Sequence, residues 1–202
     1  EIYIVFSSDF TFVRNKETPD DLVNAYRLAI AYGLRPGEIL GLQWGDIDDD
    51  TIHIRRAINV KNEQTDGKNS LAIRDLPQTK YTRGIFFAQE QFRSTRSPSE
   101  RVFGYYAEPT LRSRWERYCN YNGIPYITPY ELRHTFASIY KMALPLWILD
   151  ELMGHAHQGV TLGIYSHAMS DDMSDVPRIL EEKLCKQYNL GKSSYQRHNP
   201  NH

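Results

Sequence analysis

Apolar residues recur at helical spacing in two separate groups of segments, and a stretch with the partial alternation of a β-strand lies between them. This arrangement restricts the fold more than any other feature of the chain. It predicts helices, then a small sheet, then helices again, an order that is typical of the α+β class.

The first group of helices is delimited by proline and glycine. Thr18 can cap a helix and Pro19 fits its first turn, with acidic residues following at the positive helix end. A buried face is then formed by Leu22, Ala25, Leu28, Ala29 and Tyr32. Gly33 favours a left-handed C-cap, and Pro36 can open a second short helix that runs to about Gln43.

The middle of the chain predicts a three-stranded antiparallel sheet. Thr51–Ile58 alternates like a strand, and Asp66-Gly67 is a turn signal. Ser70–Leu76 and Gly84–Phe87 are the candidates for the next two strands, which would place Lys80 in the turn between them.

Helices return after Pro109. Leu111, Trp115 and Cys119 share one face of a helix that Asn122-Gly123 would close. Four further helices are predicted, over Pro129 to about Met142, Leu146–Met153 with Gly154 as its end, Val160–Met169 and Val176–Tyr188.

Composition fits one ordinary globular domain. The chain has 202 residues, 41% hydrophobic and 24% charged, and no apolar run approaches the roughly 20 residues of a membrane span. Its two cysteines, Cys119 and Cys185, favour reduced thiols in a cytosolic protein. The net charge of −1 neither favours nor excludes nucleic acid, because the acids between Asp171 and Glu182 offset basic residues elsewhere.

Four polar residues suggest a covalent phosphodiester chemistry. Arg35 and Arg133 could clamp a phosphate, since guanidinium is always charged and forks onto two oxygens. His155 could hydrogen-bond or protonate that phosphate, and the Tyr165 hydroxyl could attack it. Taken singly, each has a plainer explanation, such as a surface arginine or one of fourteen packed tyrosines.

Three passages, in order, resemble the catalytic domain of the tyrosine recombinases, the phage-integrase family. They are Tyr32–Ile47 with Gly-Leu-Arg-Pro-Gly-Glu, Tyr130–Ser138 with Glu-Leu-Arg-His, and Leu152–His155 followed by Thr161–His167 with Leu-Gly-Ile-Tyr-Ser-His. Together they span almost the whole stretch from Asp20 to Ala168.

The resemblance implies roles for these residues. Arg35 and Arg133 correspond to the paired phosphate-binding arginines, and His155 to the histidine that hydrogen-bonds the scissile phosphate. Tyr165 corresponds to the nucleophile, which would form a 3′-phosphotyrosyl DNA and needs neither cofactor nor metal. Lys80 resembles the hairpin lysine that protonates the 5′-oxygen leaving group, with Lys68 as its competitor.

Three more residues are expected to support or line the site. Glu38 could hold a neighbouring arginine or histidine, or could simply stabilise the first turn of its helix. The family's second box usually opens with histidine, whereas this chain has Tyr130, which cannot shuttle a proton near pH 7 as histidine can. His167 could support the loop that carries Tyr165.

The resemblance also implies an organisation and partners. We expect an N-terminal extension over residues 1–17, a catalytic domain over 18–188 and a polar tail over 189–202, without the N-terminal helical domain that relatives carry. The expected partner is double-stranded DNA at attachment sites, bound weakly by this domain alone. A monomer would assemble into a homotetramer on DNA, in the cytoplasm of a prokaryote and near its nucleoid. The segment Val176–Tyr188 could dock on a neighbouring protomer or on its own domain.

Three alternatives stay open at this point. A type IB topoisomerase shares the same arginine, histidine and tyrosine chemistry, although the small size and the Leu-Met-Gly-His box favour a recombinase. A DNA-binding module of the same fold that has lost turnover is suggested by Tyr130. A purely structural helical domain is the third.

Overall fold

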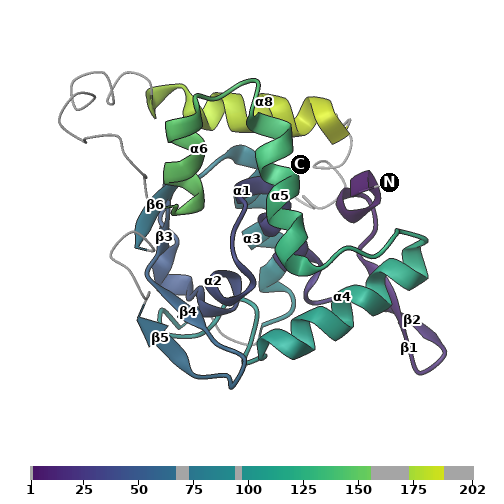
Figure 1. The fold of residues 1–202 in the computed structure, drawn as a ribbon. Coiled ribbons are helices and arrows are strands. Elements are labelled where there is room, and N and C mark those ends of the chain that lie inside the picture. Colours follow the sequence, from purple (N-terminus) through teal and green to yellow (C-terminus); the bar gives the residue numbers. More distant parts are fainter. Residues whose placement is uncertain (1, 67–72, 94–96, 156–172, 189–202) are drawn as a thin grey trace, which may run out of the picture.

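The computed structural model describes residues 2–66, 73–93, 97–155 and 173–188. Figure 1 shows helices gathered around a central helix, with short strand pairs at two separate edges of the fold. The α+β class predicted from the sequence is confirmed. The helices of these residues are α1 (Val23–Tyr32), α2 (Pro36–Gly41), α3 (Lys80–Glu90), α4 (Glu108–Asn122), α5 (Pro129–Tyr140), α6 (Leu146–Met153) and α8 (Val176–Tyr188), with 3-10 turns at Ile2–Phe6 and Trp44–Asp46.

The strands form three antiparallel pairs. They are β1 (Phe10–Val13) with β2 (Lys16–Pro19), β3 (Thr51–Ile54) with β6 (Arg74–Pro77), and β4 (Arg56–Ile58) with β5 (Gln64–Asp66). Thr51 lies opposite Pro77, and Arg56 lies opposite Asp66. The chain thus runs out along β3 and β4 and returns along β5 and β6, so that the β4–β5 pair follows the β3–β6 pair along one hairpin.

Helix α1 lies at the centre of the fold. It packs against α5 and α3, and every one of its residues is buried. Aromatic rings join it to α4, where the Tyr26 and Trp115 ring centroids are 4.6 Å apart and Trp115 stacks on Tyr118 at 5.7 Å. Such pairs add to the free energy of burying the rings.

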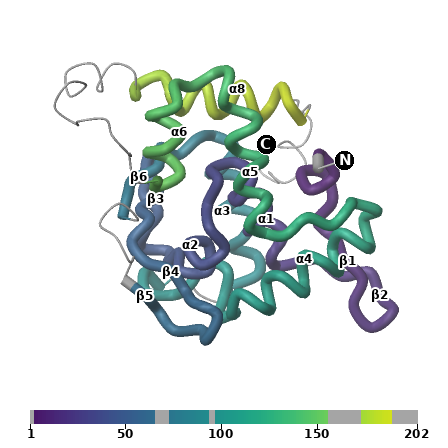
Figure 2. Tube along the Cα trace, in the orientation of Figure 1, coloured from purple at the N-terminus to yellow at the C-terminus, as the bar shows by residue number. Residues whose placement is uncertain are grey.

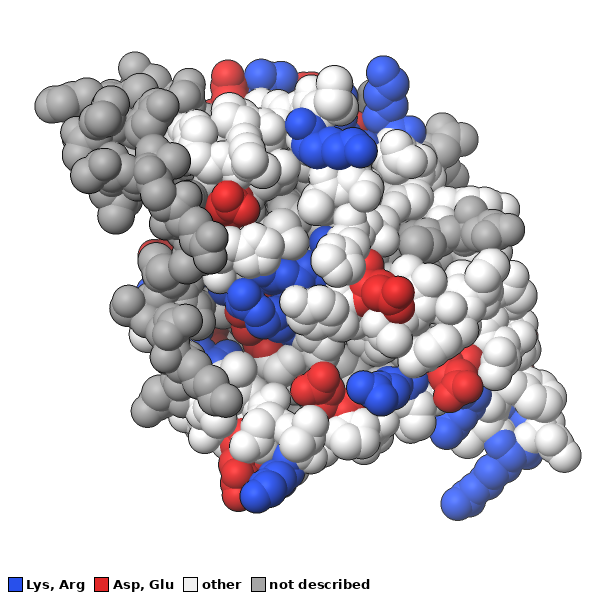
Figure 3. Space-filling view, viewed as in Figure 1, with Lys and Arg blue, Asp and Glu red and all other residues white. Residues whose placement is uncertain are grey.

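The last helix packs on its own domain. Val176, Leu180 and Leu184 of α8 are buried, and the Tyr140 hydroxyl of α5 donates to the Leu180 carbonyl at 3.0 Å. The tube in Figure 2 follows α8 across α5. On the face shown in Figure 3, lysine and arginine side chains gather in a hollow between α2, α5 and α6. No helix in the described part of the chain is long and apolar enough to span a membrane.

Two local predictions were wrong. Gly84–Phe87 is not a strand but belongs to α3, which begins at Lys80 because Thr79 caps it by accepting the Thr82 N–H at 3.2 Å. A short apolar run does not distinguish a strand from a buried helical turn. Lys80 therefore opens a helix and does not lie in a hairpin turn.

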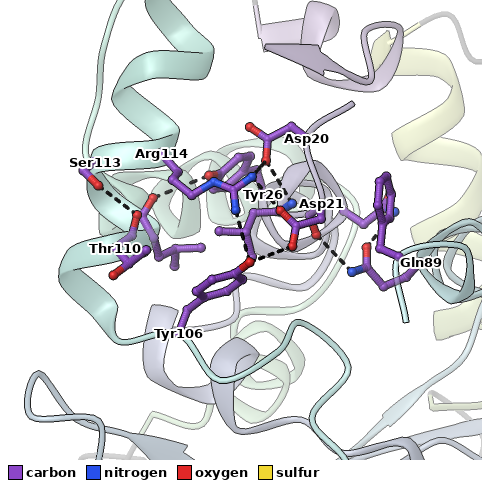
Figure 4. A network of polar contacts seen from close by, with 12 residues as sticks. Asp20, Asp21, Tyr26, Gln89, Tyr106, Thr110, Ser113 and Arg114 are labelled. Carbon is purple, nitrogen blue, oxygen red and sulfur yellow. Dashed lines mark hydrogen bonds and ion pairs between the residues drawn. The ribbon is translucent and has the colours of Figure 1, made fainter. Parts of the chain in front are cut away.

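The first long helix begins later than predicted. Thr18 and Pro19 lie in β2, and α1 starts at Val23. Asp20 still accepts the Leu22 N–H at 3.0 Å before α1, and it also pairs with Arg114 of α4, as Asp21 does (Figure 4).

The remaining helix ends agree with the sequence. Gly33, Gly123 and Gly154 each adopt a left-handed conformation at a helix C-terminus, and α6 has the predicted bounds. The helix predicted over Val160–Met169 lies outside the described residues. Residues 2–17, predicted as an extension, pack on the domain, with Val5 fully buried and its carbonyl bonded to Arg27 Nε at 2.8 Å.

Gly33→Ala should destabilise the fold more than Gly123→Ala. Both glycines have a positive φ, +63° and +65°, so an alanine at either position costs about 1–2 kcal/mol of backbone strain. Only at Gly33 would the new Cβ meet a packed side chain, 2.8 Å from Phe136 Cδ1. Urea denaturation of both variants measures the difference, which overpacking puts at about 1–3 kcal/mol. Equal losses would show that Phe136 yields freely.

Candidate active site

Arg35 and Glu38 form a unit where α1 meets α2. Gly33 ends α1, Pro36 opens α2, and Arg35 between them is extended at the N-cap position. Glu38 reaches back one turn, and its carboxylate accepts the Arg35 main-chain N–H at 2.9 Å and Arg35 Nη1 at 2.6 Å. The sequence Gly-Leu-Arg-Pro-Gly-Glu therefore fixes the guanidinium by local backbone geometry.

Arg133 comes from α5 and is almost completely buried, at 1% exposure. Its Nη1 donates to the Gly33 carbonyl at 2.5 Å, and its Nη2 donates to the Met153 carbonyl at 2.6 Å. Arg133 thus ties the end of α1 to the end of α6, although the three residues are widely separated in the sequence.

Arg74 is a third arginine at this place, and sequence reasoning missed it. Its Nε donates to the Leu152 carbonyl at 2.8 Å, while Nη1 and Nη2 donate to the two carboxylate oxygens of Glu38 at 3.1 and 2.9 Å. The strand pattern contained the signal. Ile73 and Asp75 are exposed whereas Arg74 and Leu76 are buried, so a strand with Leu76 inward also turns Arg74 inward.

The three guanidinium groups converge on the carboxyl end of α6. Arg35 adds two contacts there, with Nη2 3.1 Å from the Gly154 carbonyl and Nη1 3.5 Å from that of Met153. The last carbonyls of a helix carry partial negative charge and lack partners within the helix. This end of α6 is therefore capped by arginines, and the hollow with basic side chains in Figure 3 lies beside it.

His155 follows this capped helix end directly. Gly154 reverses the backbone at φ 65°, and the His155 N–H bonds to the Asp150 carbonyl at 2.9 Å. The ring Nδ1 lies 3.2 Å from Asp150 Oδ1, which orients the imidazole, and the side chain is 42% exposed. The histidine thus follows directly on the helix end that the arginines contact, and within residues 2–66, 73–93, 97–155 and 173–188 its Nε2 has no hydrogen-bond partner.

Burial and charge oppose each other within the cluster. Burial acts to raise the pKa of Glu38, but the hydrogen bonds and charge of Arg74 and then Arg35 outweigh it, so the pKa of the carboxyl is lowered. Burial first, and the charge of Arg35 second, lower the pKa of Arg133 to about 10. Both groups are therefore ionised at neutral pH.

Tyr130 lies at the surface of the protein. It is the second residue of α5 and 51% exposed, and its ring meets that of His134 edge-on at 5.8 Å. With Pro36 of α2 and Arg112 of α4 it borders a shallow pocket of about 90 Å³. Tyr130 thus lies at the surface near Pro36, the residue after Arg35, and its role as a lining residue stays a prediction.

Of the other predicted site residues, the structure describes Lys80 alone. Lys80 is the first residue of α3, and the N–H of the next residue, Tyr81, bonds to Glu181 of α8 at 3.0 Å. Tyr165, His167 and Lys68 lie outside the described residues, so their predicted roles stay predictions. Several basic residues noted in the sequence pair with acids, among them Arg56 with Asp46.

Glu38→Gln should destabilise the protein by about 3 kcal/mol or more, because it leaves buried arginines without their counter-charge. It should also change acid denaturation. A carboxyl with a lowered pKa stabilises the fold fully above its unfolded pKa of about 4.3, and this stabilisation is lost as the pH falls through the lower folded value. Unfolding free energies measured from pH 7 to pH 3 should therefore decline less steeply in the variant. Glu116→Gln, at an exposed position of α4, is the control and should change little.

Comparison with known proteins gives one consistent relationship. The model of the phage integrase family matches residues 10–171. An XerC-like tyrosine recombinase of Caldanaerobacter subterraneus subsp. tengcongensis is 23% identical over 188 residues, which cover 78% of this chain and 48% of the relative. The transposase from transposon Tn916 of Enterococcus faecalis is 40% identical over 75 residues, 36% of this chain and 18% of that protein. The chain thus spans about half the length of the first of these relatives and less of the second.

Solved structures share the fold. The Tn1549 transposon integrase in complex with circular intermediate DNA superposes with a TM-score of 0.59 at 20% identity, covering 83% of this chain and 63% of that one. A lambda integrase dimer bound to a core site superposes with a TM-score of 0.52 at 16% identity, covering 78% and 53%. With a family model matched over residues 10–171 and this architecture, the chain belongs to the phage integrase family of tyrosine recombinases.

Proposed function

We propose that this protein is a tyrosine-type site-specific DNA recombinase that breaks and rejoins DNA through a 3′-phosphotyrosyl intermediate. The observation that carries the proposal is the convergence of Arg35, Arg133 and His155 at the carboxyl end of α6. Two charged donors and an oriented imidazole at one partly open place are what a phosphodiester transfer requires.

The proposed reaction balances without a cofactor. The Tyr165 oxygen attacks the scissile phosphorus, the bond from phosphorus to the 5′-oxygen breaks, and the tyrosine becomes esterified to the 3′ end. The tyrosine gives up its proton, and a lysine returns one to the leaving 5′-oxygen. Arg35 and Arg133 stabilise the charge that builds up on the phosphoryl oxygens. Attack by a free 5′-hydroxyl on the ester then rejoins the strand.

When a phosphate binds, its oxygens would replace a main-chain carbonyl as hydrogen-bond acceptor of an arginine. The Arg35 side chain is 34% exposed, whereas Arg133 is closed off and gives its Nη hydrogens to the carbonyls of Gly33 and Met153. We infer that a phosphate meets Arg35 first. Its oxygens then replace the Met153 carbonyl on Arg133, and that carbonyl turns away while the Leu152 carbonyl stays on Arg74.

The relatives support a role in moving DNA. Two of them are a transposon transposase and a transposon integrase, and the latter was solved with circular intermediate DNA. We therefore propose integration or excision of a mobile element, with double-stranded attachment sites as substrate. A tetramer on DNA is supported by the lambda integrase tetramer bound to a Holliday junction, which shares this fold with a TM-score of 0.54.

Tyr165→Phe should abolish covalent attachment to DNA. A nicked suicide duplex, with its sequence taken from the DNA that flanks the gene, traps the cleaved state because the short fragment beyond the nick diffuses away. The wild-type protein should give an adduct that survives denaturing electrophoresis, and the variant should give none while still shifting the duplex in a native gel. If the complete gene product forms no adduct on its own flanking DNA, the enzymatic proposal fails and a DNA-binding module replaces it.

The two candidate lysines can be separated by substitution. The resemblance calls for a lysine in a hairpin; in the sequence Lys68 lies between the residues of β5 and those of β6, whereas Lys80 opens α3. We expect Lys68→Ala to slow cleavage by about 10²–10⁴-fold, the usual worth of a general acid, and Lys80→Ala to slow it far less. A duplex with a 5′-bridging phosphorothiolate has a leaving group that needs no proton, so it should restore cleavage by the Lys68 variant. Rescue of the Lys80 variant instead would return the role to that residue.

A further inference from the structure

Arg74 is a buried charged group of the site, like Arg133 and Glu38. Its side chain is 3% exposed, and so is that of Glu38, to which it presents a two-pronged contact. A buried arginine is retained only where its charge and donors are matched, because stripping a cation of water is costly. Here the two Nη groups of Arg74 donate to both carboxylate oxygens of Glu38, which also supplies the counter-charge, and Nε donates to the Leu152 carbonyl.

These contacts join three parts of the site that are distant in sequence. Arg74 belongs to β6, Glu38 to α2 beside Arg35, and Leu152 to the α6 end that precedes His155. Removing the Arg74 guanidinium would leave Glu38 held by Arg35 alone among these contacts. It would also take away the donor that holds the Leu152 carbonyl. The placement of Arg35 and that of His155 therefore depend on the same side chain.

We infer that Arg74 is a positioning residue for DNA strand cleavage, which holds Glu38 with Arg35 and the α6 end with His155 in their working geometry. The inference rests on the proposed recombinase function. Because Arg74 is buried behind these groups, it acts through them and makes no contact with substrate. Its loss should slow the chemical step without weakening DNA binding.

The positioning role of Arg74 depends on the planar, forked shape of its guanidinium group. Its planar fork meets both carboxylate oxygens while Nε points along a different direction. A lysine keeps the charge but offers a single nitrogen, so it cannot hold Glu38 and the Leu152 carbonyl in the same way. Small displacements suffice, since a misplacement of about 1 Å can cost about 10²-fold in rate.

The acid limb of the cleavage reaction gives a second readout. The charged groups that face Glu38 are Arg35 beside its own helix, Arg74 from β6 and Arg133 from α5, whereas Arg56 of β4 packs at the far end of α2 on the Gly41 carbonyl. Arg74 is the strongest of the partners that lower the pKa of Glu38. Without it the carboxyl protonates at a higher pH, and activity should fall off at a higher pH on the acid side.

The test compares Arg74→Gln and Arg74→Lys with a matched control, Arg114→Gln. Arg114 also bridges buried acids, Asp20 and Asp21, but it lies away from the cluster, in the network of Figure 4. Single-turnover cleavage of the nicked suicide duplex at saturating protein should slow by about 10²-fold in Arg74→Gln and stay markedly slow in Arg74→Lys. Dissociation constants for the same duplex, measured in a Tyr165→Phe background, should change by less than about threefold. The acid limb should move to higher pH only in Arg74→Gln.

The outcomes separate this inference from the function on which it rests. If wild-type protein forms no adduct, the proposed function fails. If it does, and Arg74→Gln cleaves like Arg114→Gln with an unmoved acid limb, the positioning role is overturned. If Arg74→Gln does not fold, the cleavage rate of Arg74→Lys is measured below its unfolding temperature. A slow rate supports the positioning role, and a rate like that of Arg114→Gln overturns it. A large loss of DNA affinity would instead mean that Arg74 contacts substrate.

Discussion

One buried carboxylate organises the site. Glu38 contacts Arg35 and Arg74, and its charge also acts on Arg133. Three cations against one anion leave a net charge of two positive units at a place that excludes most water. The last carbonyls of α6 add partial negative charge through the helix dipole. This charge reduces the repulsion between the three guanidinium groups when no ligand is bound. For the proposed reaction this surplus is suitable, because the pentacoordinate phosphorus carries two negative charges and the starting diester only one. A site with this surplus favours the transition state over the ground state.

Most of the helices could be predicted because their limits are set locally. Gly33, Gly154 and the Thr128-Pro129 pair act within one turn of the chain, so their effect is legible in the sequence. Where a distant partner decides, the prediction failed. Asp20 and Asp21 are good first-turn residues for a helix, yet Arg114 lies 94 and 93 positions away and holds them before α1 begins. Gly84–Phe87 failed for a different reason, since the decisive signal was the threonine cap before Lys80 and not the apolar run itself.

The residues of the candidate site also fall into those that a local motif indicates and those that depend on distant contacts. Arg35, Arg133 and His155 were found through family motifs, and the structure brings them together. The alternation around Leu76 indicates only that Arg74 points inward, and Arg74 was missed because its partners there depend on the pairing of Thr51–Ile54 with Arg74–Pro77. The misplacement of Lys80 has the same origin. Without the strand register, the turn of the hairpin could not be located, and a lysine in a helix was taken for one in a turn.

The hydrogen bonds of Arg133 impose a condition on how such a site can work. A guanidinium at 1% exposure must have its donors satisfied at all times, with or without substrate. In this structure the carbonyls of Gly33 and Met153 provide that satisfaction. They are neutral acceptors, weaker than phosphate oxygens, so in the proposed reaction an incoming phosphate can displace the Met153 carbonyl at a net gain. Because Met153 directly precedes Gly154 and His155, that displacement moves the histidine as well. Phosphate binding and placement of His155 are then one event, and a site without DNA stays incomplete for a physical reason.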